Sequence, residues 1–214
     1  MLRRLLSLAL VACVALAAGC RPQPEGALKI VVIGGEPKLV DPAAGPVSTS
    51  DAVLLQNVAQ GLVQFDANGN IVSGLAERWN VSDDGLSYIF RIASASWPDG
   101  TKITSQQVAR LLKRQLGRRS NNGLKDALGS VEDIVAMTDR VIEIRLIAPR
   151  PNLLPLLAQP EFAIIRDDQG TGPFSAVRTG GSGGETRLSS EVVSAEEEVT
   201  RPRPGPPRSS RRAP

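Results

Sequence analysis

Short apolar runs separated by turn-forming residues predict a chain that mixes strands with helices. Residues 28–33 are rich in β-branched side chains and are followed by two glycines, which predicts a buried strand. Large apolar side chains recur at every second position between Leu86 and Ile92, and residues 141–147 alternate in the same way. This two-residue period is typical of a strand with one buried face. Residues 162–165 predict one further strand.

Two segments carry the signals of capped helices. Ser50 or Asp51 can cap a helix whose apolar side chains share one face. These apolar positions are Leu54, Leu55, Val58 and Leu62. Thr104 and Gln107 form a capping box, which predicts a second helix that continues through Leu112.

Turn signals separate these elements. The pair Asn68-Gly69 lies between two apolar runs and predicts a tight hairpin, and residues 97–100 predict a turn. Residues 152–157 are expected to form a brief helix, and the glycines of residues 180–184 are expected to form a flexible loop. Because strands and helices do not alternate strictly, we expect an α/β fold of the mixed, α+β kind.

The first twenty residues resemble a bacterial lipoprotein signal. Arg3 and Arg4 precede an uncharged run that is shorter than the roughly 20 apolar residues of a membrane-spanning helix. Small residues then lead to Cys20, as in a lipobox, in which this cysteine is acylated and becomes the first residue. We expect residues 1–19 to be removed and residues 20–27 to form a tether. The alternative is an ordinary secretory signal with a chance cysteine near its cleavage site.

Missing residue types exclude most classes of enzyme. The chain has no His, and its two cysteines, Cys13 and Cys20, belong to the N-terminal signal. A Ser-His-Asp triad, a His-based general base and a structural zinc site are therefore impossible. The Gly-x-Ser-x-Gly pattern of residues 180–184 lacks the His partner that a nucleophilic serine needs. We predict a chain that is not an enzyme and that needs no cofactor and no metal.

The positive charge of the chain is concentrated at its ends. The net charge of the chain is +3. Arg3, Arg4 and the five arginines of residues 201–214 contribute more positive charge than this, so the net charge of residues 20–200 is −4. The basic composition therefore does not indicate nucleic-acid binding, and seven aromatic residues are too few for base stacking. Residues 201–214, rich in Pro and Arg, are predicted to be disordered.

Several short motifs occur along the chain in an order known from one family. Residues 75–79 and 82–90 carry the most specific pattern, in which Leu-Ala-Glu-Arg-Trp precedes Ser-Asp-Asp-Gly-Leu-Ser-Tyr-Ile-Phe. The other motifs lie at residues 36–42, 57–63, 99–104 and 170–174. Together they resemble the N-terminal part of bacterial extracellular solute-binding proteins of the oligopeptide, dipeptide and nickel type, which serve ABC importers.

The resemblance implies part of a two-lobed periplasmic-binding-protein fold. Residues 28–174 correspond to the N-terminal lobe with its inserted subdomain, and residues 175–200 to the start of the second lobe or to a loop. Family members are far longer, so we expect the fold to be incomplete. The pair Ala59-Gln60 departs from the family, which usually has an aromatic residue followed by an acid at this place near the cleft.

The resemblance also implies a function without covalent chemistry. Such proteins capture a peptide or similar small solute between two lobes, pair its backbone like an added strand, and present it to an ABC permease in the inner membrane. We expect Gly35, Glu36, Gly61 and Phe65 to line the cleft, since loops after strand ends favour ligand sites. Lipid on Cys20 anchors such a protein to the membrane, in the periplasm or at the cell surface.

The alternative function is that of a remnant that cannot transport solute. The composition changes abruptly near Arg201, which favours a truncated or frame-shifted gene. In this case the chain is a lipoprotein that acts at most as an interaction module, with an exposed sheet edge. A reading frame that continues into a second lobe downstream of Thr200 would identify the chain as a fragment of a binding protein.

Overall fold

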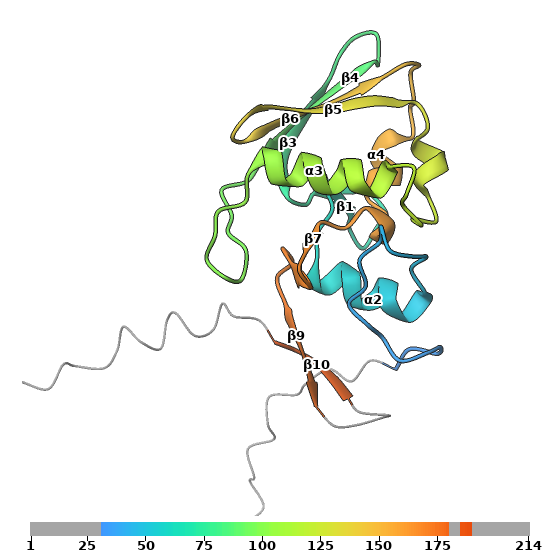
Figure 1. The fold of residues 1–214 in the computed structure, drawn as a ribbon, viewed down its shortest axis with the longest axis vertical. Coiled ribbons are helices and arrows are strands. Elements are labelled where there is room, and N and C mark those ends of the chain that lie inside the picture. Colours follow the sequence, from blue (N-terminus) through green and yellow to red (C-terminus); the bar gives the residue numbers. More distant parts are fainter. Residues whose placement is uncertain (1–30, 180–184, 190–214) are drawn as a thin grey trace, which may run out of the picture. The chain divides into compact units, whose positions relative to one another are not determined.

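The computed structural model describes residues 31–179 and 185–189 (Figure 1). The chain divides into two compact units, Met1–Ile33 and Gly34–Pro214, and every element below belongs to the second unit. The predicted lipoprotein signal, Cys20, the tether, the glycine-rich loop of residues 180–184 and the tail of residues 201–214 lie outside the described residues.

The buried strand predicted at residues 28–33 is wrong where the structure describes it. Residues 31–33 form no strand, and Val31 and Ile33 are 81% and 94% exposed. A run of β-branched residues shows only that a segment can be buried, whereas a strand also needs a neighbour that bonds its amides. Residues 28–30 lie outside the described part of the chain.

Four antiparallel strands form the main sheet, in the order β3-β4-β6-β5. The strands are β3 Ala76–Val81, β4 Ser87–Ile92, β5 Val131–Thr138 and β6 Val141–Leu146. The predicted alternation in β4 is confirmed, because Tyr88, Phe90 and Ile92 are buried while Ile89 on the opposite face is 42% exposed. In β6, Ile142 and Ile144 lie opposite Phe90 and Tyr88 and are buried with them.

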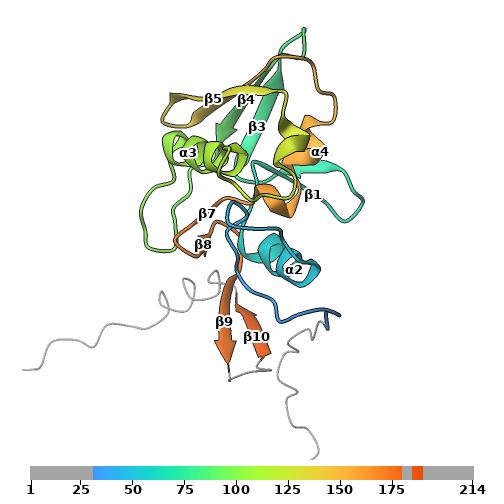
Figure 2. The same ribbon diagram turned by 45° about the vertical axis from the view of Figure 1, so that its right-hand side comes forward.

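Helix α3, Ser105–Leu116, packs against β5 and β6 (Figures 1 and 2). The predicted capping box is confirmed, because the Thr104 hydroxyl accepts the Gln107 N–H and the Gln107 side chain accepts the Thr104 N–H. Val108 and Leu112 of this helix are buried in the main hydrophobic core, together with the apolar face of the sheet. The helix therefore covers the apolar face that the strand pattern predicts.

Helix α2, Thr49–Val58, is capped by Ser48 and not by Ser50 or Asp51 as predicted. The reason is a capping box in which the Ser48 hydroxyl accepts the Asp51 N–H at 3.2 Å and the Asp51 carboxylate accepts the Ser48 N–H. Three of the four predicted apolar positions are buried within the helix. Leu62 is also buried but lies beyond the end of the helix, because the backbone is already extended at residue 59.

The predicted hairpin follows α2 and is formed by β1, Val63–Phe65, and β2, Ile71–Ser73. Its turn contains Gly69 with φ at +82°, a conformation that glycine adopts without steric cost. Asp66 closes the turn, since its Oδ1 accepts the Asn68 N–H at 2.8 Å. Phe65 is the last residue of β1 before the turn, and Gly61 lies two residues before the start of β1.

A largely buried connection follows the sheet. It consists of helix α4 Leu153–Leu157, the short turn η2 Pro160–Phe162, and strands β7 Ile165–Arg166 and β8 Gln169–Gly170, whereas the short turn η1 Lys125–Leu128 lies earlier, between α3 and β5. The brief helix predicted at residues 152–157 is confirmed. The strand predicted at residues 162–165 is wrong except at its last residue, because the Phe162 N–H closes a tight turn onto the Gln159 carbonyl at 3.0 Å. Its apolar side chains are buried, so the pattern indicates burial and not strand.

Two glycines let this connection approach α2 closely. A Cβ on Gly170 would lie 2.1 Å from the Val58 carbonyl oxygen, and a Cβ on Gly172 would lie 2.5 Å from the Val58 carbonyl carbon. Beyond them, β9 Ser175–Thr179 and β10 Glu185–Ser189 form an antiparallel hairpin. Among the described helices, none has the length and apolar character that crossing a membrane requires.

Candidate functional site

A groove opens beside β1, where two of the predicted cleft residues lie. Its volume is about 280 Å³, and it is bordered by the end of α2, by β1 and by residues 158–163. Gly61 and Phe65 line the groove. Four glutamines line it as well, namely Gln56, Gln60, Gln64 and Gln159.

Backbone hydrogen bonds on two sides position the segment that enters β1. The Ile164 N–H donates to the Gln60 carbonyl at 2.8 Å, and the Leu75 N–H donates to the Gly61 carbonyl at 2.9 Å. A Cβ on Gly61 would lie 2.7 Å from the Leu157 carbonyl oxygen, which is too close for any other residue. The absence of a side chain at Gly61 thus brings residues 157 and 61 together at the groove.

Strand β1 has one edge without a strand partner in the described part of the chain, because it pairs with β2 alone. Strand β2 contributes no residue to the groove, whereas all of β1 lines it. Phe65 at the end of β1 is 38% exposed. An extended chain can pair with such an open edge through backbone hydrogen bonds, while its side chains enter neighbouring pockets.

The groove offers neutral hydrogen-bonding groups. Within the described residues, the side-chain amides of Gln56, Gln60 and Gln64 make no hydrogen bond to another residue. Each amide can both donate and accept, as a peptide bond does. Asp66 is the one ionisable residue of the described lining, and hydrogen bonds from Asn70 hold its pKa below the ordinary value of 3.8. No cluster of three or more potential metal ligands occurs in residues 31–179 and 185–189.

The structure brings together two of the four predicted cleft residues. Gly61 and Phe65 line the groove, whereas Gly35 and Glu36 are exposed in the loop before α2 and do not line it. Sequence reasoning missed the other glutamines as site residues. Gln60 alone carried a signal, because it stands where the related family usually has an acid.

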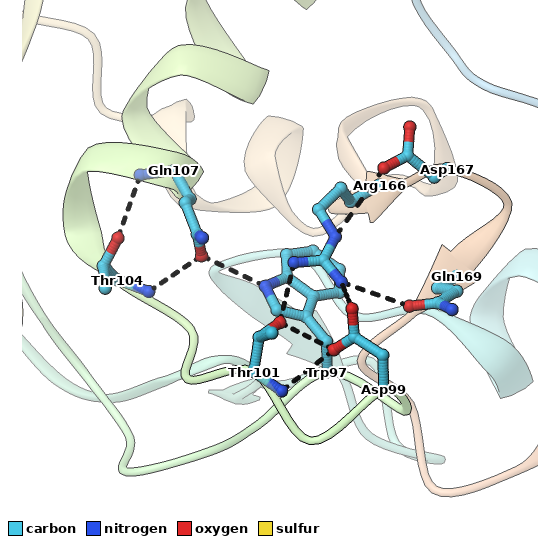
Figure 3. A network of polar contacts seen from close by, with 8 residues as sticks. All are labelled: Trp97, Asp99, Thr101, Thr104, Gln107, Arg166, Asp167 and Gln169. Carbon is cyan, nitrogen blue, oxygen red and sulfur yellow. Dashed lines mark hydrogen bonds and ion pairs between the residues drawn. The ribbon is translucent and has the colours of Figure 1, made fainter.

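A second polar cluster joins the β7–β8 hairpin to the turn of residues 97–100 (Figure 3). The Arg166 guanidinium lies 4.5 Å from the centre of the Trp97 ring, which is buried. Arg166 also donates to Thr101 Oγ1 at 2.8 Å and to Gln169 Oε1 at 3.3 Å, and it pairs with the Asp99 carboxylate. One arginine therefore holds two distant segments together.

The indole of Trp97 extends this cluster to the start of α3. Its Nε1 donates to Gln107 Oε1 at 3.1 Å, and the same oxygen accepts the Thr104 N–H at 3.2 Å (Figure 3). Hydrogen bonds from Thr101, aided by the charge of Arg166, hold the pKa of Asp99 below 3.8. Because these groups hydrogen-bond to one another, we interpret the cluster as a structural contact between segments. We take the groove beside β1 as the candidate functional site.

Comparison with known proteins relates part of the chain to one family. Residues 70–183 match the family model of the bacterial extracellular solute-binding proteins, family 5, in its middle part. The oligopeptide-binding protein AliB of Streptococcus pneumoniae is 34% identical over 106 residues, which are 47% of this chain and 15% of AliB. The chain spans between 15% and 26% of the length of the curated relatives that it matches.

Solved structures share the fold. The periplasmic binding protein AgaA from A. tumefaciens R10, in complex with agropinic acid, superimposes with a TM-score of 0.64 at 26% identity, covering 73% of this chain and 34% of AgaA. The Escherichia coli murein tripeptide binding protein MppA superimposes with a TM-score of 0.60 at 23% identity, covering 67% of this chain and 34% of MppA. The predicted mixed α/β fold, as part of a periplasmic binding protein, is confirmed.

The family match extends over more than half of the 214 residues. The family consists of solute-binding proteins, which agrees with the prediction that the chain is not an enzyme. The chain belongs to the bacterial extracellular solute-binding proteins of family 5.

Proposed function

We propose that residues 28–174 form one lobe of the substrate-binding component of an ABC importer, and that an extended peptide or similar small solute lies in the groove beside β1. Membership of family 5 supports the function. The open edge of β1 is the observation from which we place the solute in the groove. Among the similar proteins, AliB and MppA are named for an oligopeptide and a murein tripeptide, whereas AgaA holds agropinic acid.

The chemistry of the groove favours a peptide. An extended peptide pairs its backbone with the open edge of β1, and its side chains then point alternately toward the groove and away from it. The unpaired amides of Gln56, Gln60 and Gln64 can bond the carbonyl and N–H groups that β1 does not reach. Neither interaction needs a charge on the solute, so peptides of varied sequence fit the same groove.

Burial of a bound peptide needs a second surface. In the proposed mechanism residues 175–200 begin the connection to a second lobe, which closes by a hinge motion, and the permease recognises the closed complex. Gly35 and Glu36 are exposed in the loop before α2, so we assign them to contacts at the rim of the cleft and not within the groove. No bond of the solute is made or broken in this cycle.

The variant Phe65→Ala tests the groove, with Ile89→Ala as its matched control. The two side chains are similarly exposed, at 38% and 42%, but Ile89 lies on the outer face of the main sheet. A panel of di- to pentapeptides is expected to raise the melting temperature of the wild type and of Ile89→Ala. Loss of the aromatic contact in Phe65→Ala is expected to weaken binding roughly tenfold and to reduce this shift.

Two results would contradict the proposed groove. If no peptide of the panel stabilised any of the three proteins, solute capture by this chain would be wrong. If the shifts were equal in all three proteins, the peptide would bind elsewhere. Circular dichroism of the unliganded variants separates loss of binding from loss of fold.

We further propose that the chain is a lipoprotein anchored through Cys20, in the periplasm or at the cell surface. The support is the order of charged, apolar and small residues that ends at this cysteine. Two or more acyl chains hold a protein at a bilayer stably, which keeps the lobe near a permease. The variant Cys20→Ala is expected to keep residues 1–19 and to carry no lipid, as measured by mass spectrometry. An acylated Cys20→Ala protein would show that another residue carries the lipid.

A further inference from the structure

A basic patch covers the exposed side of α3 and the residues that follow it. The basic patch consists of Arg110, Lys113, Arg114, Arg118 and Arg119, all of which are exposed. The first three are three or four positions apart on α3 and therefore share one surface of the helix. No acidic residue occurs between residues 100 and 125, although residues 20–200 together carry −4. The stretch from residue 101 to residue 125 is therefore positive, within a part of the chain that is negative as a whole.

The end of the basic patch surrounds an open hollow. Arg114, Arg118 and Arg119 line this hollow, which has a volume of about 500 Å³ and is also bordered by Asp41 and Ser120. Guanidinium groups present fork-shaped sets of donors that match the oxygens of a phosphate. Three such groups around one hollow can therefore contact a phosphate from several sides.

Two of the five cations have acidic partners. Lys113 Nζ lies 2.7 Å from Asp133 Oδ1, and Arg114 pairs with Asp41. In the described residues the other three members of the basic patch form no ion pair. The negative end of α3 accounts for cations in its last turn, but two of the unpaired arginines lie beyond the helix. Stability of the lobe therefore does not explain them.

The basic patch also lacks the apolar anchors of a protein interface. No large exposed apolar side chain occurs among residues 100–125 of the described structure. Interfaces between proteins depend on a few side chains that become fully buried, most often Trp, Tyr or Arg, and residues 100–125 contain no aromatic residue beside the arginines. The surface of an acidic bilayer needs no such anchor, because each cation near it contributes its own attraction.

We propose that the basic patch binds the phosphate groups of acidic phospholipids and turns this face of the lobe toward the bilayer. The proposal deepens the proposed anchoring at Cys20 and rests on it. A lipid at the end of a tether keeps the lobe near the membrane but does not orient it. The basic patch supplies the orientation, and its attraction weakens with salt because exposed charges are screened.

A vesicle-binding experiment tests the proposal. It uses the chain from residue 20 onward with the substitution Cys20→Ser, so that no acyl chain contributes to binding. The vesicles contain phosphatidylcholine, with or without phosphatidylglycerol. We expect the chain to sediment with the phosphatidylglycerol vesicles at low salt, less at high salt, and not with phosphatidylcholine alone. The double variant Arg118→Glu/Arg119→Glu is expected to weaken this partitioning roughly tenfold or more.

The matched control is Arg78→Glu/Arg187→Glu, which changes the net charge equally at two exposed arginines of β3 and β10. We expect this control to keep most of the partitioning. Equal losses in the two double variants would overturn the proposal, because net charge and not the basic patch would then explain the binding. Matching circular dichroism spectra show that both variants are folded.

Two further outcomes would also overturn the proposal. The first is that no vesicle binds the chain at any salt concentration, as expected if the basic patch faces an acidic protein instead. The second is that titrated inorganic phosphate binds at the basic patch while vesicles do not, which would make the patch a site for a small anion. Acylation of Cys20 and peptide binding are measured separately, so a failure of the proposed function is distinguishable from a failure of the basic patch.

Discussion

At the scale of single residues, Arg166 contributes most to the cluster around Trp97. It bonds Thr101 and Asp99, which are 65 and 67 residues away in sequence, and stacks on the buried indole. Its side chain is 22% exposed, so water screens these interactions in part. We expect Arg166→Ala to lower the free energy of unfolding by about 1–2 kcal/mol, as measured by urea unfolding.

The conservative variant Arg166→Lys separates charge from geometry. Lysine keeps the positive charge but has neither the planar fork nor the stacking surface, so an intermediate loss of stability is expected. Arg78→Ala is the control, since Arg78 is exposed on β3 and forms no ion pair in the described structure. If Arg166→Ala lost no more stability than Arg78→Ala, the cluster would not hold the two segments together.

At the scale of elements, the sequence predicts best those segments whose pattern agrees with their packing. Strand β4 alternates because one of its faces is buried, and α3 starts at a capping box formed by neighbouring residues. Strand β3 was missed because it lies at the edge of the sheet, where four of its six residues are exposed. Phe162, Ala163 and Ile164 are buried without belonging to a strand, so their apolar pattern indicated the wrong element.

Some residues of the candidate site could also be predicted from the sequence, and others could not. Gly61 and Phe65 belong to a motif and a hairpin that are continuous in sequence, and both could be predicted. Gln56 comes from α2 and Gln159 from the turn after α4, about a hundred residues later. These two glutamines come together only because the connection after α4 packs against α2 and β1. No local sequence pattern encodes this packing. Contacts between distant segments are therefore the part of the site that only the structure supplies.

At the scale of the whole molecule, lowered carboxylate pKa values link stability to pH. A hydrogen bond to a nearby side chain is the largest cause of each shift, and the ordinary values are 3.8 for Asp and 4.5 for Glu. The five groups are Asp66, Asp84, Asp99, Asp133 and Glu143. Since each folded-state pKa is below the unfolded one, the stabilisation is complete above about pH 5 and is lost as the pH falls through the folded values.

The variant Asp84→Asn removes one of these titrating carboxylates and keeps the geometry of its hydrogen bonds. Asp84 accepts hydrogen bonds from the Ser82 hydroxyl and the Leu86 N–H, which lower its pKa, and the asparagine oxygen can accept both without titrating. We expect the fall in urea midpoint between about pH 6 and about pH 3 to be smaller in this variant than in the wild type. Asp83→Asn is the control, because Asp83 is exposed and makes no hydrogen bond in the described residues. We expect the urea midpoint of this control to fall as much as that of the wild type. An equal fall in Asp84→Asn would show that the turn between β3 and β4 does not contribute to acid unfolding.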